Sequence, residues 1–439
     1  MDIKELKQKV CEVIDENRDR IIGIGEEIFS NPELGYKEYK ATELIAREFQ
    51  KLGLNPEKNI AVTGVRARVN ETKNGPTIAV LGELDSVICV EHEAADPKTG
   101  AVHACGHHIQ AASLMGAAIG LVASNVIGEL DGELDFMAVP AEEFVELEFR
   151  GKLRDEGKIS YFGGKQELIK RGYFDDVDMS IMMHALNMPK EKKVIEGAVG
   201  NGFIGKNVNF IGKEAHAGSA PEQGVNALNA AMIAINNIHV QRETFPDGDR
   251  VRVHPIITKG GDIVNVVPAD VRMETYVRAR TIKGIDQANE KVNRAIIAGA
   301  YAVGANVKII ETPGYLPLLR TPDMDELFKA NAAEIVSPEQ IVDGADFTGS
   351  FDFGDVSHLM PALHPFIGGV EGNLHTREFK VVDPETAYIL SSKTLAMTII
   401  DLLYDGAEAA NAIIEKFEPQ MTKEEYLAFL EKNSRTIEK

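Results

Sequence analysis

The segment AVHACGHHIQ, residues 101–110, places three residues that bind soft metal ions, His103, Cys105 and His107, at alternate positions. In an extended chain, residues two apart point to the same side, so Cys105 and His107 can converge on one ion, and His103 shares their parity. Gly106 gives the backbone room for that approach. Thiolate and imidazole favour Zn²⁺, and added carboxylates make Mn²⁺ or Co²⁺ suitable as well.

Further donors stand at the ends of other predicted strands. Adjacent Glu142 and Glu143 follow the apolar run GELDFMAVP, His184 closes SIMMH, and His375 follows HPFIGGVEGNL. In an open parallel sheet, ligands collect beyond the carboxyl ends of the strands, so we expect these side chains to meet. Five donors exceed what one tetrahedral zinc uses. The set therefore predicts two ions that share a ligand, a geometry associated with hydrolysis.

The adjacent glutamates suit two different tasks. Neighbours in an extended chain point to opposite sides, so one carboxylate can bind metal while the other handles the proton of a water nucleophile. A divalent ion lowers the pKa of a water to about 7. Taken singly, Cys105 would be a small buried hydrophobe, and His184 and His375 would be structural histidines. Their joint placement at strand ends favours a metal site.

Composition and missing motifs exclude other classes of function. The chain has no GxxxxGK[ST], no GxGxxG after a strand, no GxSxG and no HExxH. Its net charge of −21 would repel nucleic acid and anionic membranes. The N-terminal segment is charged throughout, and three cysteines do not make a disulfide framework. We expect a cytoplasmic protein that acts on a small molecule.

The elements that must position these residues alternate between strand and helix. Apolar strand patterns at 77–85, 132–140 and 178–186 surround a helical pattern at 111–126, which predicts an α/β fold with a mainly parallel sheet and helices on both faces. Residues 197–312 follow the order β-α-β-β-α-β of a ferredoxin-like domain. Because 439 residues exceed the size of a single core, we expect an inserted domain. The predicted division is a catalytic domain at 1–196, a lid or dimerisation domain at 197–312, and the rest of the catalytic domain at 313–439.

Several ordered motifs resemble one family over nearly the whole chain. They are NPELGYKE, GELDS, HACGH, PAEEF, MMHAL, GKEAHAGSAPEQGVNALNAA, GGDIVNVVPAD and LHTREF. The sequence is similar to the dinuclear metal aminoacylase and carboxypeptidase (zinc peptidase) family, which includes auxin-conjugate hydrolases, aminobenzoyl-glutamate hydrolase subunits and related dipeptidases. The segment SFDFGDVSHLMPALHP looks most like the aminobenzoyl-glutamate utilisation protein B-type subunits.

The resemblance implies a role for each matching residue. It implies Glu142 as the general acid/base, Asp85 as a support of the ligand shell, and metal ligands at Cys105, His107, Glu143, His184 and His375. It further implies that the inserted domain brings His216 and Asn265 to the scissile carbonyl and Arg278 to a substrate carboxylate. Relatives usually carry Asp or Asn where this chain has His108, which could leave metal binding intact, alter the second shell, or replace His107 as the ligand.

These expectations combine into a metal-dependent amidohydrolase with two divalent ions per chain, Zn²⁺ or Mn²⁺, with Co²⁺ also suitable. It would cleave the amide of an N-acyl or aminoacyl amino acid, of the aminobenzoyl-glutamate or dipeptide type. The family implies a homodimer formed through the inserted domain, or a heteromeric hydrolase. The alternative is a non-catalytic amide-binding or structural subunit of the same family with an altered metal site.

Overall fold

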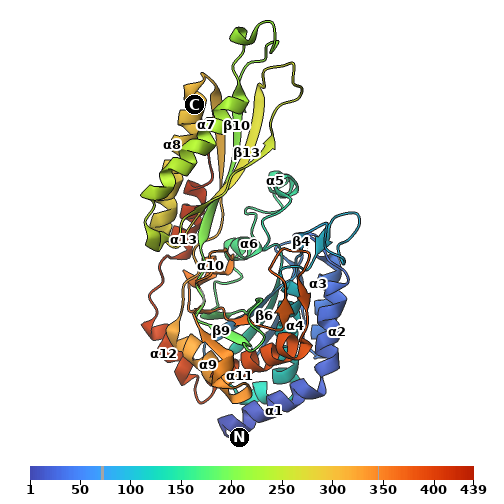
Figure 1. The fold of residues 1–439 in the computed structure, drawn as a ribbon. Coiled ribbons are helices and arrows are strands. Elements are labelled where there is room, and N and C mark those ends of the chain that lie inside the picture. Colours follow the sequence, from blue (N-terminus) through green and yellow to red (C-terminus); the bar gives the residue numbers. More distant parts are fainter. Residues whose placement is uncertain (71–73, 345) are drawn as a thin grey trace. The chain divides into compact units, whose positions relative to one another are not determined.

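The computed structural model describes residues 1–70, 74–344 and 346–439, which form two compact units (Figure 1). Unit 1 comprises residues 1–199, 319–346 and 355–420, and unit 2 comprises residues 200–318, 347–354 and 421–439. The sequence analysis assigned the whole of 313–439 to the first domain. The structure differs at the C-terminus because β20 (Arg435–Glu438) pairs with β14 (Asn306–Pro313) and thereby extends the sheet of unit 2.

The main sheet of unit 1 has six strands in the order β1-β2-β6-β3-β7-β16. Strands β6, β3, β7 and β16 run parallel, whereas β2 joins β6 antiparallel. Every residue of β3 is buried, as a strand covered on both faces requires, and the predicted mainly parallel sheet is confirmed. The strand bounds are β1 (Glu57–Ile60), β2 (Gly64–Val69), β3 (Thr77–Glu83), β6 (Glu133–Val139), β7 (Met179–Ile181) and β16 (Ala362–Leu363).

Helix α4 (His107–Ala123) lies at the centre of unit 1 and packs against β3, α2 and α11. Its sequence is apolar on nearly all sides because it is enclosed by these neighbours. Residues 385–403, which include α11, are apolar and long enough to cross a membrane, but they pack almost entirely inside the unit. The other helices are α1 (Ile3–Glu16), α2 (Arg18–Phe29), α3 (Tyr39–Lys51), α5 (Leu147–Asp155), α6 (Gly164–Arg171), α9 (Pro322–Ile335), α11 (Ser391–Leu403) and α12 (Glu408–Lys416). Helix α10 (Phe353–Ser357) has its first two residues in unit 2 and the rest in unit 1.

A second, four-stranded sheet in unit 1 has the order β15-β9-β17-β8. The predicted strand at 178–186 is divided, because β7 pairs with β3 whereas β8 pairs with β17 of this second sheet. His184 therefore stands where the chain passes from one sheet to the other. The bounds are β8 (His184–Ala185), β9 (Val194–Glu196), β15 (Ile341–Asp343) and β17 (Phe366–Ile367), with hairpins β4 (Val87–Ile88) to β5 (Ala101–Val102) and β18 (Val370–Glu371) to β19 (Lys380–Val381).

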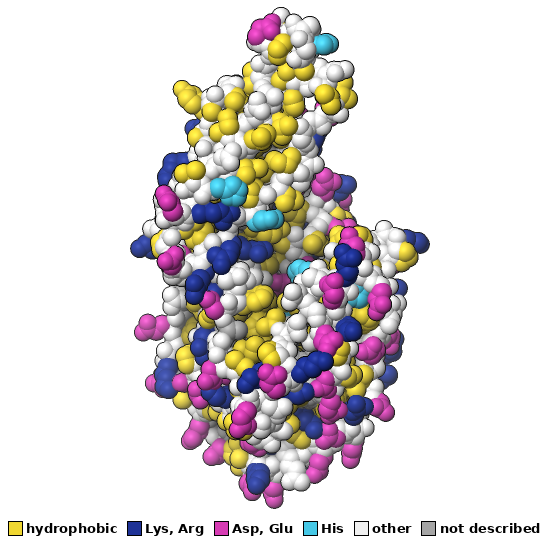
Figure 2. Space-filling model, in the orientation of Figure 1, with side chains coloured by type: hydrophobic (Ala, Val, Ile, Leu, Met, Phe, Trp, Pro, Cys, Tyr) yellow, Lys and Arg dark blue, Asp and Glu magenta, His cyan; other side chains and the backbone are white. Residues whose placement is uncertain are grey.

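Unit 2 confirms the predicted ferredoxin-like order of β10, α7, β12, β13, α8 and β14. The two helices pack together against the sheet, whose residues alternate between buried and more exposed positions along β13. Hydrophobic side chains reach the surface of this unit in Figure 2, and in and after β12 they include Ile256, Ile257, Ile263, Val264 and Val266. The remaining bounds are β10 (Gly202–Ile211), α7 (Ala227–Val240), β11 (Arg252–Val253), β12 (Ile256–Lys259), β13 (Asp270–Ala279), α8 (Ile282–Ala302) and α13 (Lys423–Lys432).

Candidate metal centre

The turn that precedes α4 places two of the predicted ligands. Gly106 is the N-cap with φ of 92°, a left-handed conformation that glycine adopts without strain, and His107 is the first residue of the helix. The sequence analysis expected an extended loop up to residue 111. The helix begins four residues earlier, so the alternation of an extended chain does not apply at His107, and the turn sets the direction of its side chain.

Cys105 lies at the middle of a group of donors that come from four separate segments. Its Sγ is 3.5 Å from His184 Nε2 and 3.3 Å from His375 Nε2. The same atom, His375 Nε2, is also 3.0 Å from Glu143 Oε1. The backbone N–H of His375 donates to Ala104 O at 2.8 Å and its φ is 63°, so a strained residue is held beside the cysteine.

His107 faces a second group of donors. Its Nδ1 lies 2.8 Å from the carbonyl oxygen and 3.1 Å from the carboxylate of Asp85, which leaves Nε2 to face the site. That Nε2 is 3.0 Å from Glu83 Oε2 and 3.8 Å from Glu142 Oε2. Asp85 also accepts from the backbone N–H of Glu143 at 2.8 Å. The Asp85 carboxylate thus contacts both a histidine and the loop that carries the two glutamates.

The charges of the site depend on one another. Burial and Glu143 raise the pKa of the Cys105 thiol, but the neighbouring histidines outweigh them and lower it to about 6. Burial also raises the pKa of Glu143, whereas His375 and other positive neighbours bring it down to about 2. The Glu143 carboxylate in turn raises the pKa of His375, and Glu83 raises that of His107 despite its burial. Protonated histidines therefore separate a thiolate from carboxylates, and divalent cations would supply the same positive charge.

This set of donors fits two divalent cations. Cys105, His107 and His184 present ligand atoms within 4.8 Å of one another, and so do Cys105, Glu143 and His375. The two groups share the cysteine, as two ions with a common ligand require. Soft sulfur with imidazole and carboxylate suits Zn²⁺ and accepts Mn²⁺ or Co²⁺. All five ligands implied by the family resemblance lie in this one place.

Glu83 and Lys165 are two residues of the site that sequence reasoning missed. Glu83 forms a third donor group with His107 and Glu142, and its Oε1 is 2.5 Å from Lys165 Nζ, both side chains being fully buried. Gln110 donates to the other carboxylate oxygen at 2.7 Å. Lys165 lowers the pKa of Glu83 well below its usual value against the effect of burial. The alternation of Glu83 and Asp85 at the end of β3 was a usable signal, whereas nothing in the sequence marks Lys165.

His108 does not occupy the predicted second shell. It is the second residue of α4, so its side chain points about 100° away from that of His107, and its ring lies 5.0 Å from Phe29 and 5.6 Å from His103 between ring centroids. Burial lowers the pKa of His108 to about 3, so its imidazole is neutral. His103 shares this apolar environment and is absent from the donor groups of the described residues. Of the two adjacent histidines, His107 is the one that faces the metal donors.

The three residues predicted for substrate contact belong to unit 2. His216 and Asn265 are neighbours, because the N–H of Ala217 donates to Asn265 O at 2.9 Å. Nδ1 of the exposed His216 accepts from Gly218 and Ser219, both at 3.1 Å, so the proton of a neutral ring is on Nε2. Arg278 is eight residues beyond the start of β13, about 26 Å along the strand, in a hollow of about 320 Å³ lined also by Arg252, His254 and Tyr276. The structure does not bring Arg278 together with the other two.

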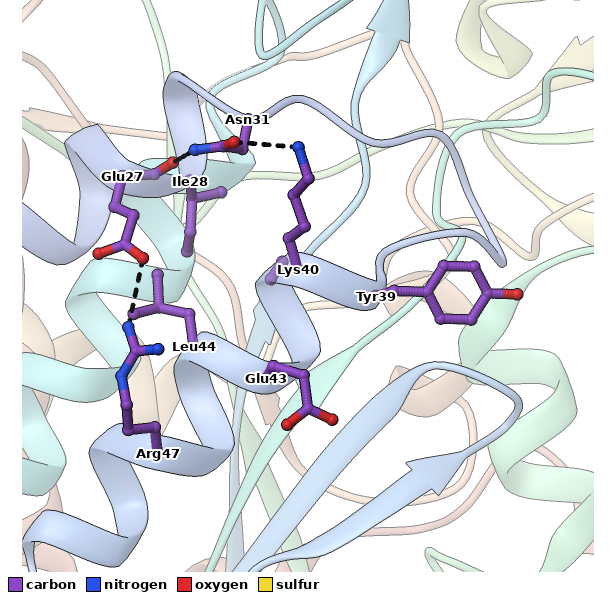
Figure 3. A pocket seen from close by; sticks show the side chains of 9 residues that line it. Glu27, Ile28, Asn31, Tyr39, Lys40, Glu43, Leu44 and Arg47 are labelled. Carbon is purple, nitrogen blue, oxygen red and sulfur yellow. Dashed lines mark hydrogen bonds and ion pairs between the residues drawn. The ribbon is translucent and has the colours of Figure 1, made fainter.

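Another hollow in unit 1, of about 430 Å³, lies between α2 and α3 (Figure 3). Its charged side chains have partners: Arg47 contacts Glu27 at 3.2 Å, Lys40 donates to Asn31 at 3.1 Å, and Glu43 pairs with Lys58 at 2.8 Å. Within the described part of the chain, its lining residues form no group of metal donors. The hollow therefore offers no chemistry comparable to the centre around Cys105.

The chain is similar in sequence to known peptidases and hydrolases. Residues 201–302 match the model of the M20 peptidase dimerisation domain. Xaa-Arg dipeptidase from Mus musculus is 29% identical over an alignment of 451 residues, which covers 97% of this chain and 95% of that protein. IAA-amino acid hydrolase ILR1-like 4 from Arabidopsis thaliana is 28% identical over 364 residues, 80% of this chain and 77% of the relative.

Solved structures share the fold. A putative aminohydrolase from methicillin resistant Staphylococcus aureus superposes with a TM-score of 0.73 at 21% identity and covers 90% of this chain and 100% of its own. The Bacillus subtilis YXEP protein, described as a dinuclear metal binding peptidase from the M20 family, has a TM-score of 0.67 at 21% identity, with 89% and 99% covered. Aminobenzoyl-glutamate utilization protein from Klebsiella pneumoniae has a TM-score of 0.66 at 18% identity, with 89% and 97% covered.

Proposed function

Because this chain belongs to the M20 peptidase family and is a metallohydrolase of dipeptides or amino-acid conjugates, we propose that it cleaves the amide between an acyl or aminoacyl group and an amino acid. The observation that carries the proposal is the meeting of Cys105, His107, Glu143, His184 and His375 next to the buried Glu142. Relatives of this length include a dipeptidase, which supports dipeptides among the candidate substrates.

The protein's own groups divide the chemistry. Cys105, His107, Glu143, His184 and His375 would hold two divalent cations, which would supply polarisation of the amide carbonyl and a bound water of lowered pKa. Glu142 takes the proton of the attacking water and delivers it to the leaving amine, since its carboxylate points at the same donors as His107. Asp85 keeps His107 and Glu143 in place through its contacts with both. The family resemblance assigns His216 to the developing oxyanion with Asn265 near it, and a neutral His216 ring would donate from Nε2 because its Nδ1 accepts from Gly218 and Ser219.

The direct test is hydrolysis of a panel of N-acyl amino acids, dipeptides that end in Arg or other residues, and aminobenzoyl-glutamate. Each substrate is offered with Zn²⁺, Mn²⁺ and Co²⁺ in turn, and the matched control is Glu142→Gln. We expect the variant to bind the same amount of metal and to lose about 10²- to 10⁴-fold in kcat. Full turnover by Glu142→Gln would remove the role given to Glu142, and wild type that cleaves none of the amides would remove the function.

The rival of a non-catalytic subunit depended on His108 disturbing the metal shell. His108 points into an aromatic environment instead, between Phe29 and Tyr388. Metal analysis of protein purified without chelator distinguishes the two ideas. About two divalent ions per chain supports the hydrolase, and none supports the binding subunit.

A dimerisation domain is present in unit 2, and we propose a homodimer formed through it. The apolar side chains in and after β12, among them the 95% exposed Val264, give a second copy an apolar surface to cover. Light scattering of the full chain, with activity measured on the same peak, tests this. A dimeric, active peak is expected, whereas an inactive monomer would support the heteromeric alternative.

A further inference from the structure

We propose that Arg150 and the segment NPELGYKE (residues 31–38) act as a clamp that positions the loop carrying Glu142 and Glu143. The inference rests on the proposed function, because it assigns positioning residues to the same site. Among the described residues, the hydrogen bonds by which Arg150 and Glu38 hold this loop are to its backbone and not to the ligand atoms of Glu142 or Glu143.

Arg150 supplies the first part of the clamp. It lies on α5, its side chain is fully buried, and its guanidinium donates to three backbone carbonyls. These are Phe162 O at 2.7 Å, Ala141 O at 3.4 Å, and Glu143 O. A buried guanidinium is costly unless its donors are satisfied, and its planar fork suits several carbonyls at fixed angles. Arg150 therefore holds the loop on both sides of Glu142.

Glu38, which lies much earlier in the chain than Arg150, supplies the second part of the clamp. Its carboxylate is fully buried, and Oε1 accepts from the backbone N–H of Ala141 at 2.8 Å, while Thr63 donates to the other oxygen. Glu38 therefore binds the backbone N–H of Ala141, and Arg150 binds the carbonyl of the same residue. Ala141 has φ of 56°, a left-handed conformation that is unfavourable for a residue with a Cβ. Two fixed partners stabilise that strained residue next to Glu142.

The rest of NPELGYKE makes room for these contacts. A Cβ on Gly35 would run into the Arg150 guanidinium and lie 2.9 Å from the Cα of Ala141, so only glycine fits there. The Tyr36 ring lies 5.4 Å from the guanidinium carbon, which adds a cation–π contact. The carbonyl of Glu33 accepts from Ser86, the residue after Asp85. The segment therefore contacts both the loop that carries Glu142 and Glu143 and the loop that carries Asp85.

The test measures metal affinity and coordination as well as turnover. Arg150→Met and Glu38→Ala are compared with wild type, Arg150→Lys serves as the conservative rescue, and Arg154→Met is the matched control. Arg154 is exposed on the same helix and lies over the Phe162 ring at 4.8 Å without touching the loop. We expect Arg150→Met and Glu38→Ala to weaken Zn²⁺ binding about 10- to 100-fold in competition with a chromogenic chelator. Their Co²⁺ absorption spectra should change, and kcat should fall with KM nearly unchanged.

Arg150→Lys should recover part of the affinity, and Arg154→Met should match wild type. If Arg150→Met and Glu38→Ala fold with the wild-type circular dichroism spectrum and keep wild-type metal affinity, Co²⁺ spectrum and kcat, the clamp is refuted. If Arg150→Met does not fold, Arg150→Lys decides: about a threefold or greater loss of metal affinity supports the clamp, and unchanged affinity overturns it. Weakened metal binding in the variants would support the clamp even if wild type cleaved none of the amides, so the two proposals fail separately.

Discussion

Replacing Lys165 by Met leaves the Glu83 carboxylate buried without its cation. The two groups are 2.5 Å apart with neither side chain exposed, and Glu83 keeps hydrogen-bonding partners in Gln110 and His107. Removal of one partner of such a pair costs about 3–5 kcal/mol. Unit 1 has about 290 residues, and an unfolding entropy of about 2.1 cal/mol/K per residue converts this cost into a fall of about 5–8 °C in the unfolding midpoint.

The measurement is a thermal scan of Lys165→Met with metal removed by chelator, beside Lys170→Met as the matched control. Lys170 is exposed on the same helix, so its substitution should change stability by less than about 0.5 kcal/mol. The double variant Glu83→Gln with Lys165→Met should recover most of the loss, because no uncompensated charge remains. Saturating divalent metal should also reduce the loss, since cations beside His107 give Glu83 new positive neighbours. A midpoint for Lys165→Met within 2 °C of wild type in chelator would refute this reasoning.

Three more predictions follow from the geometry. Metal binding at pH 7 should release protons, because His107 and His375 have raised pKa values in the metal-free protein. The affinity for divalent metal should therefore rise with pH. Calorimetry in buffers of different ionisation enthalpy measures the release, and the absence of released protons would contradict the prediction. His108→Phe should reduce the loss of stability on acidification. The pKa of His108 is about 3 in the folded protein and 6.5 ordinarily, so below pH 6.5 proton uptake by the unfolded chain destabilises the fold by about 1.4 kcal/mol per pH unit. Thermal unfolding midpoints at pH 7.5 and 5.5 measure this, with substitution of the exposed His239 by Asn as the control. Gly106→Ala should cost about 1–2 kcal/mol and weaken metal binding, because φ of 92° is strained for alanine and the new Cβ would lie 3.1 Å from Ala185.

The sequence was sufficient to find residues that follow strands. Glu142, Glu143 and His184 were located because an apolar run precedes each of them, and parallel strands bring their carboxyl ends to one edge, whereas Asp85 was implied by the family resemblance. The fold class and the ferredoxin-like insertion came from the same reading of strand and helix order. These features depend on local sequence patterns and on a topological rule, so they can be predicted from the sequence alone.

Errors arose where a backbone dihedral decides the outcome. Treating residues 101–110 as extended gave His103 the same parity as Cys105 and His107 and left open whether His107 or His108 is the ligand. The left-handed turn at Gly106 starts α4 at His107 and sends His103 and His108 into an apolar environment. The C-terminal residues were also misassigned, because the pairing of β20 with β14 is a contact between distant segments that no local pattern reveals.

The buried basic residues Lys165 and Arg150 were not predicted from the sequence because neither would bind metal or substrate directly. Lys165 neutralises a carboxylate that contacts His107, so its loss is a question of charge that metal can partly correct. Arg150 donates to backbone carbonyls on both sides of Glu142, so its loss is a question of loop geometry that added metal cannot correct. If both assignments are right, saturating Zn²⁺ should restore the unfolding midpoint of Lys165→Met but leave the kcat of Arg150→Met low. Equal rescue of both variants by metal would mean that Lys165 and Arg150 serve the site only as positive charges that balance its carboxylates.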